Sequence, residues 1–279
     1  MKKQTKKFWI SYILFTIILS FSLYKITVKQ INYREIESQE IDIRKLASII
    51  EIKDINDNTE IVNPPDENIP AEQPDIDIAP NDYWYYINLP LISVDFNSLI
   101  EKNHDTVAWI ALNGTNINYP VVQATDNDYY LYHAFDHSDN QAGWVFMDYR
   151  NNPIEFSHNT VIYGHGMNNN TIFGTLRYIT ENWWYNNPDN HIVKLSTPSE
   201  NTLWQVFSVY TIPEETYYIQ TDFTDTNLYK EFLSKLQARS IYNFNASVNE
   251  NDKIITLSSC YNNDLRVVLH AKLIKREKR

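Results

Sequence analysis

The chain has 279 residues, enough for one sizeable domain with additional segments. Glycine is scarce and tyrosine abundant, which fits a β-rich globular body rather than a disordered chain. The formal net charge is −11, and with five lysines in the first 25 residues the remainder is more acidic still. Such a body repels phosphate, which argues against nucleic acid as a partner.

The first predicted element is a membrane anchor. Residues 8–24 carry no charge, four lysines precede them and one follows. A run of roughly 17–25 apolar residues spans a bilayer. This run is long for a signal peptide and lacks a small-residue cleavage site after it, which favours a retained anchor over a cleaved signal. The positive-inside rule then places residues 1–7 in the cytoplasm and the body outside the cell.

Residues 25–82 are predicted to lift the body off the membrane. The segment 26–50 mixes isoleucines with alternating charges, as a stalk helix does. Residues 51–80 hold five prolines among acids and amides. That composition cannot bury enough apolar surface to fold, so we expect a semi-rigid extended linker. The folded domain is expected over residues 83–279.

The domain begins with a predicted helix over 93–102, which Ser93 caps. Further helices are predicted over 172–179 and 227–239, the second with apolar residues at helical spacing. Runs with strand character, broken by Asn, Asp and Gly, lie at 107–112, 119–123, 144–148, 160–163, 191–195, 202–210, 253–258 and 266–274. About eight strands with few helices between them indicate a barrel or a sandwich.

Three residues at the ends of apolar runs are candidates for acyl-transfer chemistry. Cys260 ends the run 254–260, and Arg266 opens the next run six positions later. His165 follows the run 160–163 and stands between two glycines, which permit close approach of a substrate backbone. A thiolate attacks carbonyls, an imidazole moves protons and a guanidinium faces a developing oxyanion. The nearby arginine also favours the thiolate form of the cysteine.

Each candidate also has a structural interpretation. The single cysteine excludes an intramolecular disulfide, and a lone thiol is often a small core residue. A lone histidine is usually a polar surface residue, and Arg266 could pair with an acid such as Asp264. His270, inside the last strand, is expected to be structural. The histidines show no metal-ligand spacing, and the acids within 126–136 are expected to form a solvated loop rather than a calcium site. No metal and no cofactor are therefore expected.

Several ordered motifs resemble the sortase family of cysteine transpeptidases. Thr256-Leu257-Ser258-Ser259-Cys260 is similar to the family signature Thr-Leu-x-Thr-Cys with its following arginine, and Tyr163-Gly164-His165-Gly166-Met167 is similar to the family's histidine segment. The helix-containing insertion before the cysteine strand is typical of class B members. So are Trp109-Ile110 and the segments 118–123, 126–131 and 148–150. The resemblance covers about residues 83–274.

The resemblance implies a mostly β fold: a closed eight-stranded barrel with a short N-terminal helix and an inserted helix before the cysteine strand. It implies an enzyme that cleaves a C-terminal sorting signal of secreted proteins after a threonine and transfers the thioacyl product to a peptidoglycan amine. Such an enzyme, which also has peptidase activity, sits in a Gram-positive-type envelope. Cys260 would be the nucleophile, His165 the proton carrier and Arg266 the oxyanion and substrate clamp. The positions that match the lining of the sorting-signal groove are Ser258, Asn127, Leu131, Tyr218 and Ile219.

Two features depart from the family pattern. Ser259 replaces the usual threonine but keeps a hydroxyl, and the spacing from Cys260 to Arg266 is short for class B. Three alternatives stay open at this point: a pilin-polymerising sortase, an L,D-transpeptidase-like wall enzyme, and a non-catalytic surface binding module. The second usually has glycine where this chain has Ser259, and alkylation of Cys260 would separate the third from an enzyme.

Overall fold

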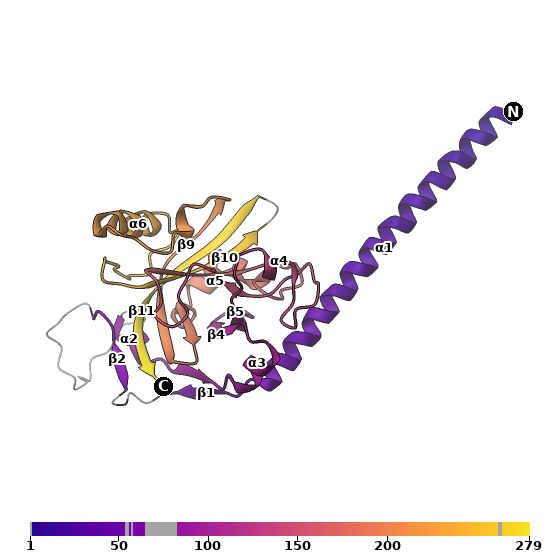
Figure 1. Ribbon diagram of the computed structural model, residues 1–279. Coiled ribbons are helices and arrows are strands. Elements are labelled where there is room, and N and C mark those ends of the chain that lie inside the picture. Colours follow the sequence, from indigo (N-terminus) through magenta and orange to yellow (C-terminus); the bar gives the residue numbers. More distant parts are fainter. Residues whose placement is uncertain (1, 54–55, 57, 65–82, 262–263) are drawn as a thin grey trace.

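The computed structural model describes residues 2–53, 56, 58–64, 83–261 and 264–279. A single long helix, α1 (Lys2–Leu46), projects from a β-rich body (Figure 1). The other helices are α2 (Tyr83–Ile87), α3 (Asn97–Lys102), α4 (Tyr129–Tyr132), η1 (Gly174–Thr180), α5 (Asn182–Tyr185), η2 (Pro188–Asn190), η3 (Tyr217–Ile219) and α6 (Thr226–Ala238), where η marks a 3₁₀-helix. The strands are β1 (Ile49–Ile52), β2 (Thr59–Ile61), β3 (Leu91–Val94), β4 (Thr106–Leu112), β5 (Asn118–Val122), β6 (Phe146–Met147), β7 (Asn159–Gly164), β8 (Ile192–Ser196), β9 (Glu200–Pro213), β10 (Ile254–Tyr261) and β11 (Leu265–Lys278).

Eight strands close into a barrel. Their order is β10-β7-β6-β5-β4-β8-β9-β11, and pairing between β10 and β11 closes the ring. The pairs β7–β10 and β5–β6 are parallel and the others are antiparallel. Closure gives each of these strands a neighbour on both sides, although β10 covers only Leu265–Lys272 of β11. The predicted eight-stranded β-barrel is therefore confirmed.

All eight runs predicted as strands coincide with β4 to β11, although β6 is reduced to two residues. The inserted helix predicted over 227–239 is α6. Its buried side chains, Tyr229, Phe232, Leu233 and Leu236, lie on one face, which is the spacing that predicted it. The core contains large aromatic side chains that are fully buried, among them Trp109, Trp144, Trp204, Phe135 and Phe173.

The helix predicted over 93–102 starts later than expected. Leu91–Val94 is the strand β3, which pairs with β1, so Ser93 cannot cap a helix. The carboxylate of Asp95 instead accepts a hydrogen bond from the backbone N–H of Asn97, at 3.0 Å, where α3 begins. Strand pairing satisfies the backbone of Ser93, and this long-range contact overrides its local preference.

The predicted helix over 172–179 is also wrong in type and start. Ile172 has a positive φ of 53°, outside the right-handed helical region, and the following turns form the 3₁₀-helix η1. The backbone is crowded here: a Cβ on Gly174 would lie 2.1 Å from the carbonyl oxygen of Met167. Only glycine fits so close an approach.

Part of the predicted linker is folded onto the body. Strand β1 pairs with β3, and β2 pairs with the C-terminal end of β11. Composition does not reveal these pairings, because the strands that they join lie elsewhere in the sequence. The remainder of the proline-rich segment, residues 65–82, lies outside the described residues.

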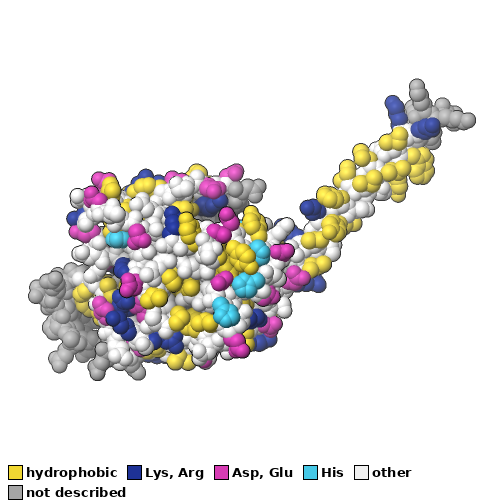
Figure 2. All heavy atoms as spheres, in the orientation of Figure 1, with side chains coloured by type: hydrophobic (Ala, Val, Ile, Leu, Met, Phe, Trp, Pro, Cys, Tyr) yellow, Lys and Arg dark blue, Asp and Glu magenta, His cyan; other side chains and the backbone are white. Residues whose placement is uncertain are grey.

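The predicted anchor and stalk form one continuous helix. Within the described residues, α1 alone is long and apolar enough to cross a membrane. Figure 2 shows hydrophobic side chains along its outer part. Its last turns dock on the body, where Ile36 and Ile43 are buried and the carboxylate of Glu40 accepts a 2.7 Å hydrogen bond from the Tyr119 hydroxyl.

Candidate active site

A groove lies at one end of the barrel, where β7, β10 and β11 meet the segment that follows β9. Every predicted site residue except Cys260, whose side chain lies outside the described part of the chain, lines this groove. Its lining consists of Asn127, Asp128, Leu131, Phe146, Tyr163, Gly164, His165, Glu214, Glu215, Thr216, Tyr218, Ile219, Ser258 and Arg266. The structure thus brings together residues that lie up to 139 positions apart, as Asn127 and Arg266 do.

The backbone of Cys260 lies between the two other expected catalytic residues. Strand β10 runs between β7 and β11. On one side, Cys260 is directly opposite Arg266 in the antiparallel ladder. On the other side, Ser259 is paired with Gly164 in the parallel ladder, so the next residues on these strands are Cys260 and His165. Because neighbouring strands lie about 5 Å apart, a thiol, an imidazole and a guanidinium are carried on adjacent backbones.

The imidazole of His165 is oriented by a backbone carbonyl. Its Nε2 lies 3.0 Å from the carbonyl oxygen of Leu131. A carbonyl oxygen only accepts hydrogen bonds, so Nε2 carries the hydrogen and Nδ1 of the neutral ring is the nitrogen that can accept a proton. Burial lowers the pKa of His165, the Leu131 carbonyl partly opposes this by raising it, and the charge of Arg266 lowers it further. The imidazole is therefore neutral near pH 7 unless an anion approaches it.

Gly164 allows this histidine segment to pack tightly. A Cβ on Gly164 would lie 2.6 Å from the ring of Phe173, which is fully buried. The backbone N–H of Phe173 in turn donates a 3.0 Å hydrogen bond to the carbonyl of His165. The glycine that the sequence indicated is thus needed for close packing behind the imidazole.

Arg266 forms an ion pair at the groove. Its Nη2 lies 2.6 Å from Oε2 of Glu214, and its Nη1 donates to the carbonyl of Leu265 at 3.2 Å. The acid that pairs with Arg266 is therefore Glu214, which follows β9, and not the Asp264 that sequence proximity suggested. A second acid of this rim, Glu215, pairs with Arg239.

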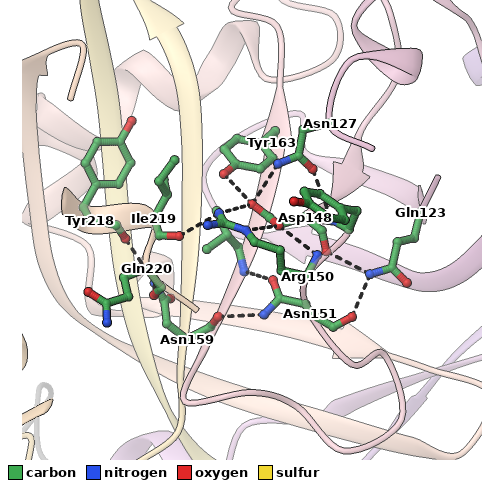
Figure 3. Close-up of polar contacts among 12 residues, drawn as sticks. Gln123, Asn127, Asp148, Arg150, Asn151, Asn159, Tyr163, Tyr218, Ile219 and Gln220 are labelled. Atoms are coloured by element: carbon green, nitrogen blue, oxygen red, sulfur yellow. Dashed lines mark hydrogen bonds and ion pairs between the residues drawn. The ribbon is translucent and has the colours of Figure 1, made fainter. Parts of the chain in front are cut away.

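The remaining predicted groove residues are placed by hydrogen bonds of their own. The hydroxyls of Ser258 and Tyr218 lie 3.0 Å apart and are buried. Leu131 acts through its carbonyl, as described above, and Ile219 accepts a 3.0 Å hydrogen bond from Arg150 through its carbonyl. Asn127 donates to the carboxylate of Asp148 at 2.9 Å (Figure 3).

The acids expected to form a solvated loop stabilise turns. Asp126 accepts hydrogen bonds from the backbone N–H groups of Asp128 and Tyr129, both at 2.9 Å. Asp136 accepts from the backbone and the hydroxyl of Ser138. These bonds are local Asx-type contacts.

Sequence reasoning missed several groove residues. Glu214, Glu215 and Thr216 follow β9 directly, and no motif marked them. Asp148 and Arg150 belong to a family-like segment to which no role was assigned, yet Figure 3 shows them at the centre of a hydrogen-bond network that includes the groove residues Asn127, Tyr163 and Ile219. The sequence did contain a signal for Asp148. It directly follows a strand and stands two residues before Arg150, a spacing that makes it a candidate for a local ion pair.

Comparison with known proteins agrees with this geometry. A sequence profile of the sortase domain matches residues 110–274, more than half of the chain. Sortase B of Staphylococcus aureus is 36% identical over 184 residues, which cover 64% of this chain and 75% of that protein. This chain belongs to the sortase family, class B.

Two solved structures fit well. A Bacillus anthracis protein described as similar to sortase B is 40% identical, with a TM-score of 0.60 over 66% of this chain and 83% of that one. A Staphylococcus aureus sortase B–substrate complex is 36% identical, with a TM-score of 0.60 over 64% of this chain and 84% of that one.

As a class B sortase, the chain is a cysteine transpeptidase, of a family that acts at the cell wall. The L,D-transpeptidase-like and non-catalytic alternatives are thereby set aside. The parts of the fold that carry the groove are the barrel strands β6, β7, β10 and β11, the segment around α4, and the segment after β9 that includes η3.

Proposed function

We propose that this sortase cleaves a C-terminal sorting signal of secreted proteins after a threonine and joins the cleaved protein to a peptidoglycan amine. The observation that supports the proposal is the strand register, in which Cys260 lies near the end of β10, with Arg266 opposite it on one side and His165 beside it on the other. A peptide bound in the groove would meet a nucleophile on β10, an oxyanion partner on β11 and a proton carrier directly after β7.

The proposed reaction has two halves. The Cys260 thiolate forms a bond to the threonine carbonyl carbon, Arg266 stabilises the oxyanion, and His165 gives a proton from Nδ1 to the departing amine as the C–N bond breaks. The acceptor amine then attacks the thioester, its proton passes to His165, and the thiolate leaves. Because guanidinium keeps its proton, Arg266 stabilises charge without competing for protons.

The location follows from α1. We propose that its apolar run 8–24 anchors the protein in the cell membrane, with the lysine-rich end in the cytoplasm and the barrel outside. The groove would then face the wall precursors and the secreted substrates. The single cysteine permits a clean test: a membrane-impermeant maleimide should label Cys260 on intact, wall-stripped cells. Labelling that appears only after permeabilisation would reverse the orientation.

The chemistry is tested with the full-length chain in detergent and a quenched fluorescent peptide that carries a Pro-x-Thr element. The wild type should cleave it and yield a thioacyl adduct by mass spectrometry. Cys260→Ala should do neither, and Arg266→Ala should be slower by about 100–1,000-fold, the usual loss for one oxyanion donor. Ser259→Thr, which introduces the common family residue, is the control and should retain activity. Turnover by Cys260→Ala would refute the proposed nucleophile.

A further inference from the structure

Asp148 is a fully buried carboxylate that the proposed reaction does not use. It follows β6 and accepts hydrogen bonds from the backbone N–H, Nε and Nη2 of Arg150, at 3.0, 2.8 and 2.6 Å. Asn127 Nδ2 and the Tyr163 hydroxyl each donate a 2.9 Å hydrogen bond to the same carboxylate (Figure 3). Burial would raise the pKa of Asp148, but the hydrogen bonds from Arg150, Asn127 and Tyr163 outweigh it and lower the pKa. The group is therefore ionised and surrounded by donors.

The partners of this carboxylate belong to different walls of the groove. Asn127 lies in the segment before α4, and Tyr163 lies on β7, two residues before His165. Arg150 reaches a third wall, because its Nη2 also donates to the carbonyl of Ile219 in η3 at 3.0 Å. Asn127, Tyr163 and Ile219 all line the groove.

We propose that the Asp148–Arg150 ion pair fixes these three walls relative to one another and thereby determines how tightly the substrate peptide is held. Both are positioning residues, because they act through Asn127, Tyr163 and Ile219. A carboxylate only accepts, so the Tyr163 hydroxyl hydrogen points at Asp148 and its ring cannot turn without breaking that bond. The inference rests on the proposed function for the identity of the substrate. The hydrogen-bond network itself is independent of that function.

The geometry explains why arginine is needed at position 150. A planar guanidinium donates to both carboxylate oxygens of Asp148 and also reaches Ile219. An ammonium keeps the charge but has no planar fork. Arg150→Lys should therefore retain a pair with Asp148 and lose the link to the η3 wall. Asp148→Asn is the more severe variant, since it removes the charge and places an amide donor among donors.

A second buried ion pair, near the C-terminal end of β11, provides a matched control for Arg150→Lys. Arg276 forms an ion pair with the buried Glu200, with 2.6 Å between Nη2 and Oε2, ten residues along the strand from Arg266. Arg276→Lys makes the same chemical change to a similar pair that does not line the groove. Any general cost of the substitution to folding appears in both variants.

The experiment compares full-length wild type, Arg150→Lys and Arg276→Lys in detergent, using the Pro-x-Thr peptide and backbone hydrogen exchange. Arg150→Lys should raise KM by about tenfold, the factor expected for one charge-assisted hydrogen bond, with kcat nearly unchanged. Exchange should accelerate in residues 126–131 and 217–221, and Arg276→Lys should show neither effect. Identical behaviour of the two variants, or a fall in kcat at constant KM, would overturn the proposal.

The exchange measurement keeps the inference separate from the proposed function. If the wild type cleaves no peptide, the proposed function fails. The positioning role is then decided by exchange alone: faster exchange confined to the two groove segments of Arg150→Lys supports it, and unchanged exchange refutes it.

Discussion

Arg266 of β11 and Glu214, which follows β9, form an ion pair at the groove with 2.6 Å between Nη2 and Oε2. The side chain of Glu214 is 74% exposed, whereas that of Arg266 is only 18% exposed. Exposed pairs of this kind contribute about 0.2–1 kcal/mol. If Arg266 acts as the proposed oxyanion partner, the carbonyl oxygen of a bound substrate would compete with Glu214 for the guanidinium.

We expect Glu214→Gln to accelerate thioacyl formation by up to about fivefold, because an oxyanion no longer competes with a carboxylate for Arg266. The free energy of unfolding should change by less than about 1 kcal/mol. Single-turnover kinetics and urea unfolding measure the two quantities. The control is Glu215→Gln, whose acid pairs with Arg239 instead. A slower reaction in Glu214→Gln alone would mean that the glutamate orients the guanidinium for catalysis.

The pKa of His165 should lie below the ordinary histidine value of 6.5, because the imidazole is buried and Arg266 is nearby. Replacing Arg266 with glutamine removes one of these causes and should raise the His165 pKa. The titration is followed by NMR of the imidazole in a Cys260→Ala background, so that no thiolate perturbs it. The exposed His104 serves as an internal reference. A His165 pKa that does not respond to Arg266→Gln would show that the charge is screened.

We expect His270 to make the protein less stable in acid. It is fully buried, its Nδ1 lies 2.8 Å from the Thr256 hydroxyl, and burial lowers its pKa to about 3. The unfolded chain takes up this proton near pH 6.5 and the folded chain only near pH 3. As pH falls between these values, His270 therefore subtracts about 1.4 kcal/mol per pH unit from the free energy of unfolding.

His270→Gln should remove that contribution and flatten the pH dependence below pH 6.5. Urea unfolding at pH 6.5, 5.5 and 4.5 gives the slope for each protein. His104→Gln, a change at an exposed position, should leave the slope as in the wild type. Equal slopes for all three proteins would mean that His270 is protonated in the folded state.

Glu40 links α1 to the loop after the histidine. Its Oε1 accepts from the Tyr119 hydroxyl at 2.7 Å and from the backbone N–H of Ile172 at 3.3 Å. Ile172 has a positive φ, which costs a β-branched residue about 1–3 kcal/mol and requires support from its surroundings. Glu40→Ala should therefore speed hydrogen exchange at Ile172 by about tenfold. Glu35→Ala, on an exposed part of the same helix, should not alter it.

The sequence indicates where the expected catalytic residues lie in the fold because each stands at one end of an apolar run: Cys260 closes a run, His165 follows one and Arg266 opens one. The barrel follows from the number and spacing of the strands. The links between segments were not predictable in the same way. The contact of Arg266 with Glu214 and the bonds that join Asp148 to Asn127 and Tyr163 depend on tertiary packing, which leaves no local pattern.

The same reason explains the misplaced elements. The short strands β1 and β2 have no strong apolar alternation, and they form because β3 and β11 offer unpaired backbone groups beside them. Ser93 has a clear local preference for a helix cap, whereas its pairing partner on β1 lies more than forty residues earlier in the sequence.

The unbroken path of α1 from the apolar run to the barrel has a geometric consequence. If residues 8–24 lie in the membrane, Ile36, the first side chain buried against the body, lies eleven positions after Lys25, a distance of about 17 Å along the helix. A helix transmits rotation as well as length. Each residue inserted in this stretch would raise the barrel by about 1.5 Å and turn the mouth of the groove by about 100° around the helix axis. The number of residues between Lys25 and Ile36 would thus determine the direction in which the groove faces its substrates.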